Sequence, residues 1–178
     1  MRFLTLSERE IKTPSIYNSI TEPHIVISIS GSLDKETQVP NNQSRVGVLH
    51  LKFDDVEDIQ EQFVYFDRGC AKEIFEFVER HCTKIGLIVV QCQAGLSRSV
   101  AVASALAKII NGRDDNVFTR GIPNMFVYTT MLEDFFADPT WQANYPKIST
   151  IRNKQLSSFL SPALVRLYGT KTKKRIEM

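Results

Sequence analysis

The sequence predicts an α/β domain in which a central, mostly parallel, twisted sheet carries helices on both faces. First, strand patterns and helix patterns alternate along the chain, as they do in doubly wound folds. Second, the runs at 24–30 and 86–90 are apolar and β-branched, which is typical of buried strands. Third, the strand pattern that ends near Cys92 is followed, after a short loop, by an alanine-rich helix pattern.

Length and composition favour a single domain over residues 1–178. A chain of 178 residues can bury a sizeable core, and 43% apolar with 24% charged residues is ordinary for a soluble globular protein. No apolar run approaches the roughly 18 residues of a membrane span, and residues 1–10 lack the apolar core of a signal peptide. The cysteines, Cys70, Cys82 and Cys92, have no metal-ligand spacing. The composition therefore predicts a reducing, cytoplasmic setting without membrane attachment.

Positive charge is concentrated in the C-terminal segment, residues 150–178. This segment holds seven basic residues and one acid, a net charge of +6, so residues 1–149 carry −4 of the total of +2. Our interpretation is a solvated tail, because the densest basic run, residues 171–175, is short and has no interleaved aromatic residue. Docking to an acidic protein or to nucleic acid stays open as the alternative.

Strand patterns dominate the first third of the chain. We expect a short strand over Phe3–Leu6, followed by a polar loop to about residue 20. Strands are predicted over His24–Ser30 and Val46–Phe53 from their β-branched and apolar residues. The polar stretch 31–44 between them should be a surface loop.

A helix is predicted from the residue after Asp67, the expected N-cap, to about Cys82. Its apolar stripe consists of Ala71, Ile74, Phe75, Val78 and Cys82. Cys70 and Cys82 are interpreted as core or half-buried residues. The histidines show no partner pattern and are interpreted as structural or exposed: His24, His50 and His81.

The second half of the chain is predicted to be mainly helical. The helix that starts near Arg98 should end at Gly112, a C-cap, and 113–121 should be a polar connection with at most one helical turn. Pro123 indicates the start of another amphipathic helix, which Pro139 ends. Later residues give two further expectations: Trp141 and Tyr145 pack on the body, and a final helical segment covers Leu156–Tyr168.

The stretch from Val89 to Ser99, V-V-Q-C-Q-A-G-L-S-R-S, carries the candidate chemistry. A strand that feeds a short loop into a helix directs backbone N–H groups and the helix N-terminus at one point, which makes an anion site. Cys92 lies at the floor of this site, where the positive field favours the nucleophilic thiolate. Arg98 offers a planar fork of donors that suits a phosphate. These parts together predict thiolate attack on phosphorus.

This motif resembles the signature of the cysteine-dependent protein phosphatases, Cys-x5-Arg followed by Ser or Thr. The A-G-L-S-R-S form is similar to that of the dual-specificity branch, and the resemblance covers roughly residues 20–137. It implies a protein tyrosine phosphatase-like fold and hydrolysis of a phosphorylated protein through a phosphocysteine, without a metal or cofactor. It also implies that Ser99 hydrogen-bonds the sulfur, and that the loop backbone holds the phosphate oxygens: Gln93, Ala94, Gly95, Leu96 and Ser97.

The general acid should lie on a loop upstream of the nucleophile, where the acidic cluster 54–58 follows a strand. A carboxylic acid there would protonate the leaving oxygen. Asp55 fits the family pattern of an apolar residue, a polar residue and the acid. Asp54 and Asp58 remain alternatives, because a short acidic cluster leaves the register open.

Two further positions depend on the resemblance. Pro123-Asn124 is similar to the Pro-Asn pair that opens a late helix in dual-specificity phosphatases, where the Asn braces loops around the site; a simple helix cap is an equally good interpretation of Asn124. Gln91 departs from the family, which places His before the cysteine. This departure puts turnover in doubt, but not phosphate binding.

Competing functions follow from the same loop. The loop contains no lysine, which disfavours a phosphoinositide substrate, and no Walker lysine follows it, which disfavours nucleotide binding. An RNA 5′-phosphatase stays open because of the basic C-terminal segment. A catalytically weak phosphate-binding module stays open because of Gln91. The short chain also suggests a shallow site that admits phosphotyrosine, phosphoserine and phosphothreonine.

Overall fold

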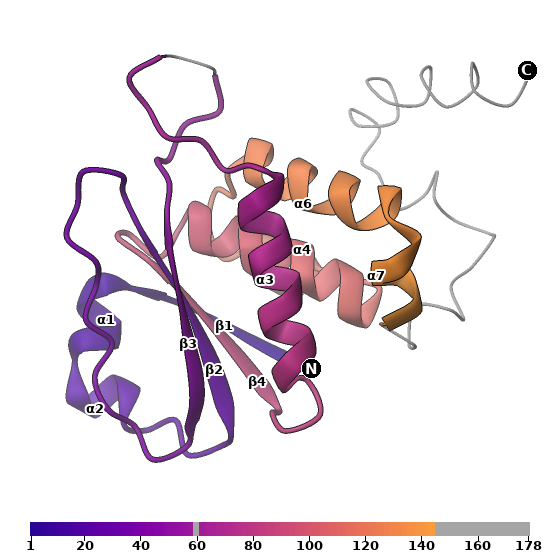
Figure 1. Cartoon of the computed structure of the whole chain (residues 1–178). Coiled ribbons are helices and arrows are strands. Elements are labelled where there is room, and N and C mark those ends of the chain that lie inside the picture. Colours follow the sequence, from indigo (N-terminus) through magenta and orange to yellow (C-terminus); the bar gives the residue numbers. More distant parts are fainter. Residues whose placement is uncertain (59–60, 145–178) are drawn as a thin grey trace, which may run out of the picture.

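The computed structural model describes residues 1–58 and 61–144, and it contains one parallel four-stranded sheet (Figure 1). Its order is β1-β4-β2-β3. The strand bounds are β1, Arg2–Ser7; β2, His24–Ser30; β3, Arg45–Lys52; and β4, Leu87–Cys92. All four strands overlap the strands predicted from the sequence, so the predicted α/β class is confirmed.

The sheet aligns the carboxyl ends of its strands on one edge. In β1, Ser7 pairs with Cys92 of β4, and in β2, Ser28 pairs with Gln91. Phe53 continues β3 at the same edge, because its N–H donates to the Ser30 carbonyl at 3.1 Å. Ligand sites of open α/β sheets form outside this edge. The fold therefore brings the residues after β3 to the loop that follows Cys92.

Helices cover both faces, but unequally. The larger core lies between one face and the later helices, which stand on one side of the sheet in Figure 1. These are α3, Arg68–His81; α4, Arg98–Asn111; α5, Asp115–Phe118; α6, Met125–Ala137; and α7, Pro139–Asn144. The smaller core, on the other face, packs residues from the strands against two short helices: α1, Glu8–Lys12, and α2, Pro14–Tyr17.

The polar loop predicted for the residues after β1 was wrong in part, because α1 and α2 form there. Ser7 and Glu10 make a reciprocal capping box: the Ser7 hydroxyl accepts from the Glu10 N–H at 3.2 Å, and the Ser7 N–H donates to the Glu10 carboxylate at 2.7 Å. The S-x-x-E spacing that predicts such a box was present in the sequence. The short length of both helices hid their periodicity.

Other local predictions are confirmed. Asp67 caps α3 by accepting from the Cys70 N–H at 2.8 Å, and Gly112 ends α4 in the left-handed conformation with φ 77°. Trp141 is buried and lies 5.4 Å from Phe75, ring centre to ring centre. Tyr145, the expected helical segment 156–168 and the basic segment 150–178 lie outside the described residues.

The cysteines and histidines behave as expected. Cys70 and Cys82 are half-buried free thiols, and burial raises the pKa of Cys70 to about 11. His24 is buried between the Glu22 carbonyl and the Tyr17 hydroxyl.

Among the described residues, no three potential metal ligands come together. In the same part of the chain, no helix has the length and apolarity needed to cross a bilayer.

Candidate active site

The loop between β4 and α4, residues 93–97, folds as a phosphate cradle would. Gly95 adopts φ 75°, a conformation that side-chain-bearing residues rarely take. A Cβ at Gly95 would lie 2.6 Å from the backbone nitrogen of Ser7, so the glycine also allows the loop to pack on β1. The Gly95 N–H donates to the Cys92 Sγ at 3.3 Å. The loop thus turns the backbone donor of Gly95 toward the sulfur.

Cys92 ends β4 at the floor of the cradle and is only 1% exposed. Its thiol donates to the Ser99 hydroxyl at 3.2 Å. When the sulfur is ionised, the Ser99 hydroxyl can donate instead, in addition to the Gly95 N–H. The ionised sulfur would therefore accept hydrogen bonds from a side-chain hydroxyl and from a backbone amide.

Arg98, the first residue of α4, is a buried cation with free bonding capacity. The residue is 5% exposed, and one terminal nitrogen donates to the Phe53 carbonyl at 2.8 Å. Its Nε lies 3.9 Å from the Asp55 carboxylate and makes no hydrogen bond to any described residue. The Phe53 carbonyl therefore fixes the guanidinium in place, while other donors remain for an anion.

The Asp55 side chain lies at the cradle and accepts hydrogen bonds from residues of two other segments of the chain. Its Oδ1 accepts from the Ser97 hydroxyl at 2.8 Å and from the Asn124 side-chain amide at 2.9 Å. Its other oxygen, Oδ2, is the one nearest Arg98. The carboxylate is 38% exposed, so a substrate's leaving group could approach it from the solvent side.

The two alternative acids occupy different surroundings. Asp54 turns away and accepts from Ser32 N–H, Ser32 hydroxyl and Val64 N–H at 2.9, 2.6 and 2.9 Å. Burial acts to raise its pKa, but these hydrogen bonds and the charge of Arg98 lower it overall. Asp58 is exposed, and no described contact joins it to the cradle; its carbonyl accepts from the Tyr65 hydroxyl. The geometry thus favours Asp55 over both.

Asn124 serves as a cap and as a brace at once. Its Oδ1 accepts from the Val127 N–H at 3.0 Å, which caps α6. Its Nδ2 donates to Asp55 and also to the Val56 carbonyl at 3.2 Å. The residue is buried, at 2% exposure. Both interpretations of the sequence therefore hold in the geometry.

Gln91 is fully buried in the sheet and does not contact the sulfur through any described hydrogen bond. Its Oε1 accepts from the Ser28 hydroxyl at 2.8 Å, and its Nε2 has no partner among the described residues. Because Val89 of the same strand belongs to the smaller core, Gln91 faces α1 and α2, opposite to Cys92. The amide braces two strands below the loop.

Sequence reasoning missed two contributions. The Phe53 carbonyl positions Arg98, and the Ser97 side chain links the cradle to the acid. A backbone carbonyl leaves no signal in residue types. Ser97 was assigned to the loop from its place in the motif, but which way its hydroxyl points depends on the fold.

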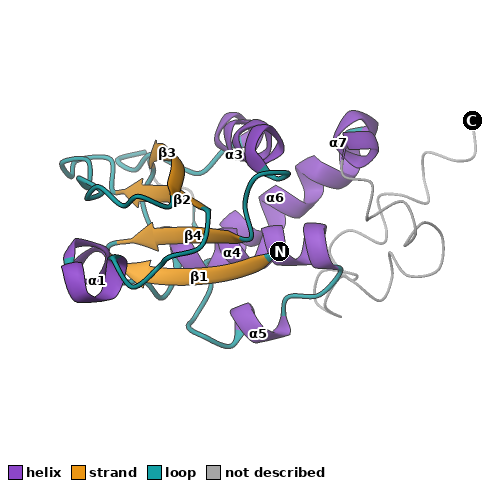
Figure 2. Cartoon of the chain, turned by 90° about the horizontal axis from the view of Figure 1, so that it is seen from below, coloured by secondary structure: helices purple, strands orange, loops and turns teal. Residues whose placement is uncertain are grey.

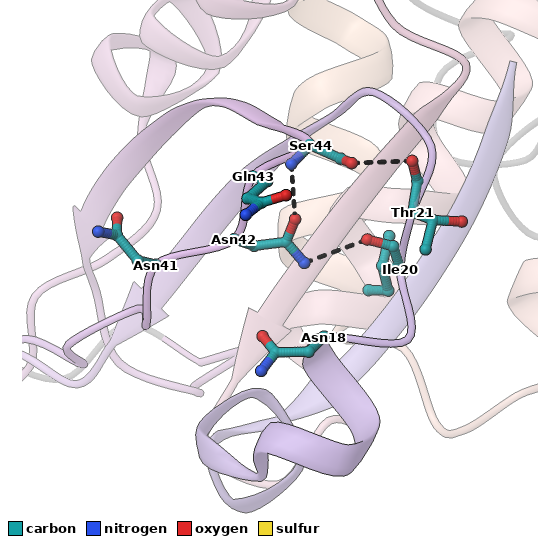
Figure 3. Close-up of a pocket in the computed structure, with 7 residues that line it drawn as sticks. All are labelled: Asn18, Ile20, Thr21, Asn41, Asn42, Gln43 and Ser44. Carbon is teal, nitrogen blue, oxygen red and sulfur yellow. Dashed lines mark hydrogen bonds between the residues drawn. The ribbon is translucent and has the colours of Figure 1, made fainter.

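A different pocket of about 750 Å³ lies at the opposite end of the sheet, before β2 and β3 (Figure 3). Neutral polar side chains dominate its lining: Asn18, Ile20, Thr21, Asn41, Asn42, Gln43 and Ser44. The Asn42 amide is already used, donating to the Tyr17 and Ile20 carbonyls and accepting from the Ser44 N–H. This lining offers no thiol and no charged side chain.

The comparisons with known proteins identify the fold. The sequence matches no protein-family model, and it matches no curated protein. The solved structures that share the fold over most of their length include the following three. Human DUSP28 has a TM-score of 0.53 at 15% identity, covering 76% of this chain and 92% of its own. DUSP15 has a TM-score of 0.56 at 16% identity, and the match covers 86% of this chain and 94% of DUSP15. A human tyrosine phosphatase-like serine/threonine/tyrosine-interacting protein has a TM-score of 0.54 at 18% identity. The match covers 76% of this chain and 91% of that protein's chain.

The fold is therefore that of the cysteine-dependent phosphatases. Among these, it is similar to the dual-specificity phosphatases and to a phosphatase-like protein of the same architecture. At these identities the likeness concerns the fold, and the chemistry must be argued from the side chains.

Proposed function

We propose that this chain is a phosphomonoester hydrolase that acts on phosphorylated proteins through a phosphocysteine intermediate. One observation carries the proposal: the loop 93–97 joins the Cys92 sulfur to the buried Arg98 guanidinium, and the Asp55 carboxylate, from the loop after β3, is hydrogen-bonded to it. A nucleophile, an anion clamp and an acid are the groups that such a reaction needs.

In the first step, the Cys92 thiolate forms a bond to phosphorus while the bond from phosphorus to the leaving oxygen breaks. The N–H groups of residues 93–98 and the Arg98 side chain hold the three non-bridging oxygens, where charge accumulates. Asp55, in its protonated form, transfers its proton to the leaving oxygen.

In the second step, a water oxygen attacks phosphorus and the sulfur–phosphorus bond breaks. Asp55, now ionised, takes a proton from that water. The departing thiolate accepts hydrogen bonds from the Ser99 hydroxyl and the Gly95 N–H, the donors that surround the sulfur in the resting site. The products are inorganic phosphate and the free thiolate, so the enzyme returns to its starting state.

Surface exposure supports a broad choice of phosphorylated residue. Leu96, on the rim of the cradle, is 53% exposed, and the Asp55 side chain is 38% exposed. A site this close to the surface admits short phosphoserine and phosphothreonine side chains as well as phosphotyrosine. Release of phosphate from an aryl phosphate and from a phosphopeptide panel, by wild type and by Cys92→Ser, tests the proposal.

A second candidate is a phosphate-binding module with little turnover. The observation that favours it is Gln91, whose amide is bonded to Ser28 and lies on the face away from the sulfur. One structural neighbour is also named as a phosphatase-like interacting protein. Tight binding of phosphopeptide without phosphate release would favour this candidate.

A further inference from the structure

A pocket of about 710 Å³ adjoins the cradle on its β1 side. It shares Ala94, Gly95 and Leu96 with the loop, and Figure 2 shows α1 beside the carboxyl ends of β1 and β4. The remaining lining comes from β1, from the α1–α2 segment and from the connection before α6: Thr5, Ser7, Arg9, Glu10, Thr13, Ile16 and Arg120.

Backbone hydrogen bonds attach both walls of this pocket to the cradle. The Glu8 N–H donates to the Gln93 carbonyl at 3.2 Å, which fixes the start of α1. The Ile122 N–H donates to the Leu96 carbonyl at 3.0 Å, which fixes the segment after Arg120. The pocket therefore keeps its place relative to a phosphate bound at Cys92.

The charges in the pocket favour an anion. No described hydrogen bond or ion pair engages the guanidinium of Arg9, and Arg120 uses only its Nε, toward the Asn116 carbonyl. Glu10 is the acid of the lining, and its carboxylate accepts from both the hydroxyl and the N–H of Ser7. These hydrogen bonds lower the pKa of Glu10, so its charge persists but serves the cap of α1. Two guanidinium groups remain for a ligand.

The apolar part of the lining distinguishes a peptide from a nucleic acid. Ile16 and Leu96 are 38% and 53% exposed beside the arginines. The lining contains no aromatic side chain, whereas single-stranded nucleic acids are held by stacking of bases on aromatic rings. A peptide side chain with a methylene stem and an acidic end suits this combination better.

We propose that this pocket is a specificity subsite that binds an acidic side chain flanking the phosphorylated residue of the substrate. The proposal rests on the proposed function, since the acidic residue is placed by the phosphoryl group in the cradle. Arg9 and Arg120 would pair with the carboxylate, and Leu96 and Ile16 would contact its stem.

The test compares phosphopeptides that differ at one flanking position. Each of the three positions on either side of phosphotyrosine carries Glu or its neutral isostere Gln, and kcat/KM is measured for each peptide. We expect Glu to be preferred on one side by about 3–10-fold, since exposed ion pairs typically contribute about 2–5-fold each. Higher salt should reduce the preference.

The Glu-to-Gln ratio is then measured in the Arg9→Gln/Arg120→Gln double variant. It should fall to about 1, while Arg113→Gln, an exposed arginine outside the pocket lining, should keep it. Because the ratio compares two peptides in one variant, a general loss of activity cancels. A ratio near 1 in wild type, or an unchanged ratio in the double variant, overturns the subsite.

The proposed function and the subsite fail in different ways. If no aryl phosphate is hydrolysed, the enzyme proposal fails, and the same ratio is measured as phosphopeptide Kd by calorimetry. If aryl phosphate is hydrolysed without any charge preference, only the subsite fails. A strong preference for 5′-triphosphate RNA over every phosphopeptide, lost in the double variant, would assign the pocket to RNA and contradict this proposal.

Discussion

The side-chain amide of Asn124 donates to the Asp55 carboxylate at 2.9 Å, although 69 residues separate the two in the chain. The same carboxylate oxygen accepts from Ser97, a residue of the phosphate loop, at 2.8 Å. The loop after β3, the loop after β4 and the start of α6 therefore meet at one oxygen. The position of the candidate acid depends on all three segments.

Asn124→Ser separates the brace from the cap. Serine is a good N-cap, so the stability of the protein should change little. Its side chain is too short to reach Asp55 from this position, so the brace is lost. We expect kcat on alkyl and peptide phosphates to fall about 10-fold, a part of the contribution of general acid catalysis. An aryl phosphate with a good leaving group should be affected less. Equal losses on both substrates would contradict the bracing role.

Asp55→Asn should slow the hydrolysis of alkyl and peptide phosphates by about 10²–10⁴-fold. The Asn amide oxygen accepts the same hydrogen bonds, but the amide cannot give a proton to the leaving oxygen. The basic limb of the pH–rate profile should disappear as well. Asp54→Asn is the matched control, since its carboxylate is bonded to Ser32 and Val64. If the control shows the larger kinetic loss, the register of the acid is wrong.

Asp54 should instead contribute to stability in a pH-dependent way. Its pKa in the folded protein is below the ordinary value of 3.8, because hydrogen bonds outweigh the effect of burial. Its stabilising effect is therefore complete above about pH 4 and is lost as pH falls through the lowered pKa. Urea unfolding of wild type and Asp54→Asn from about pH 2.5 to 7 should show a difference that shrinks toward acid. A difference independent of pH would contradict this account.

Gly95→Ala should abolish activity, because the left-handed φ and the Cβ contact with Ser7 would both force the cradle to shift. The matched control is Gly112→Ala, which also has a left-handed φ but lies at the far end of α4. Each substitution should cost about 1–2 kcal/mol of backbone strain. Only Gly95→Ala should lose phosphate binding, measured by calorimetry with inorganic phosphate. Retained binding in Gly95→Ala would mean that the loop is not the cradle.

Local patterns predicted most of the fold, because buried parallel strands and capped helices leave signals in consecutive residues. The grouping of Cys92, Arg98 and Ser99 could also be predicted, because these residues lie within one short stretch of the sequence. Asp55 was chosen by a family pattern, and spacing alone could not separate it from Asp54, because the direction of each carboxylate depends on Ser32 and Ser97. The pocket formed around Arg9 and Arg120 was not predictable, because only the packed fold brings α1 and the segment before α6 to the same loop.

The most direct test of the central claim is the mass of the protein after rapid acid quenching during turnover of an aryl phosphate. The account predicts a phosphoryl adduct on the peptide that contains Cys92 in wild type. It predicts no adduct and no turnover in Cys92→Ser, in which inorganic phosphate still binds. Turnover near the wild-type rate in Cys92→Ser, or an adduct on another residue, would contradict covalent catalysis by Cys92.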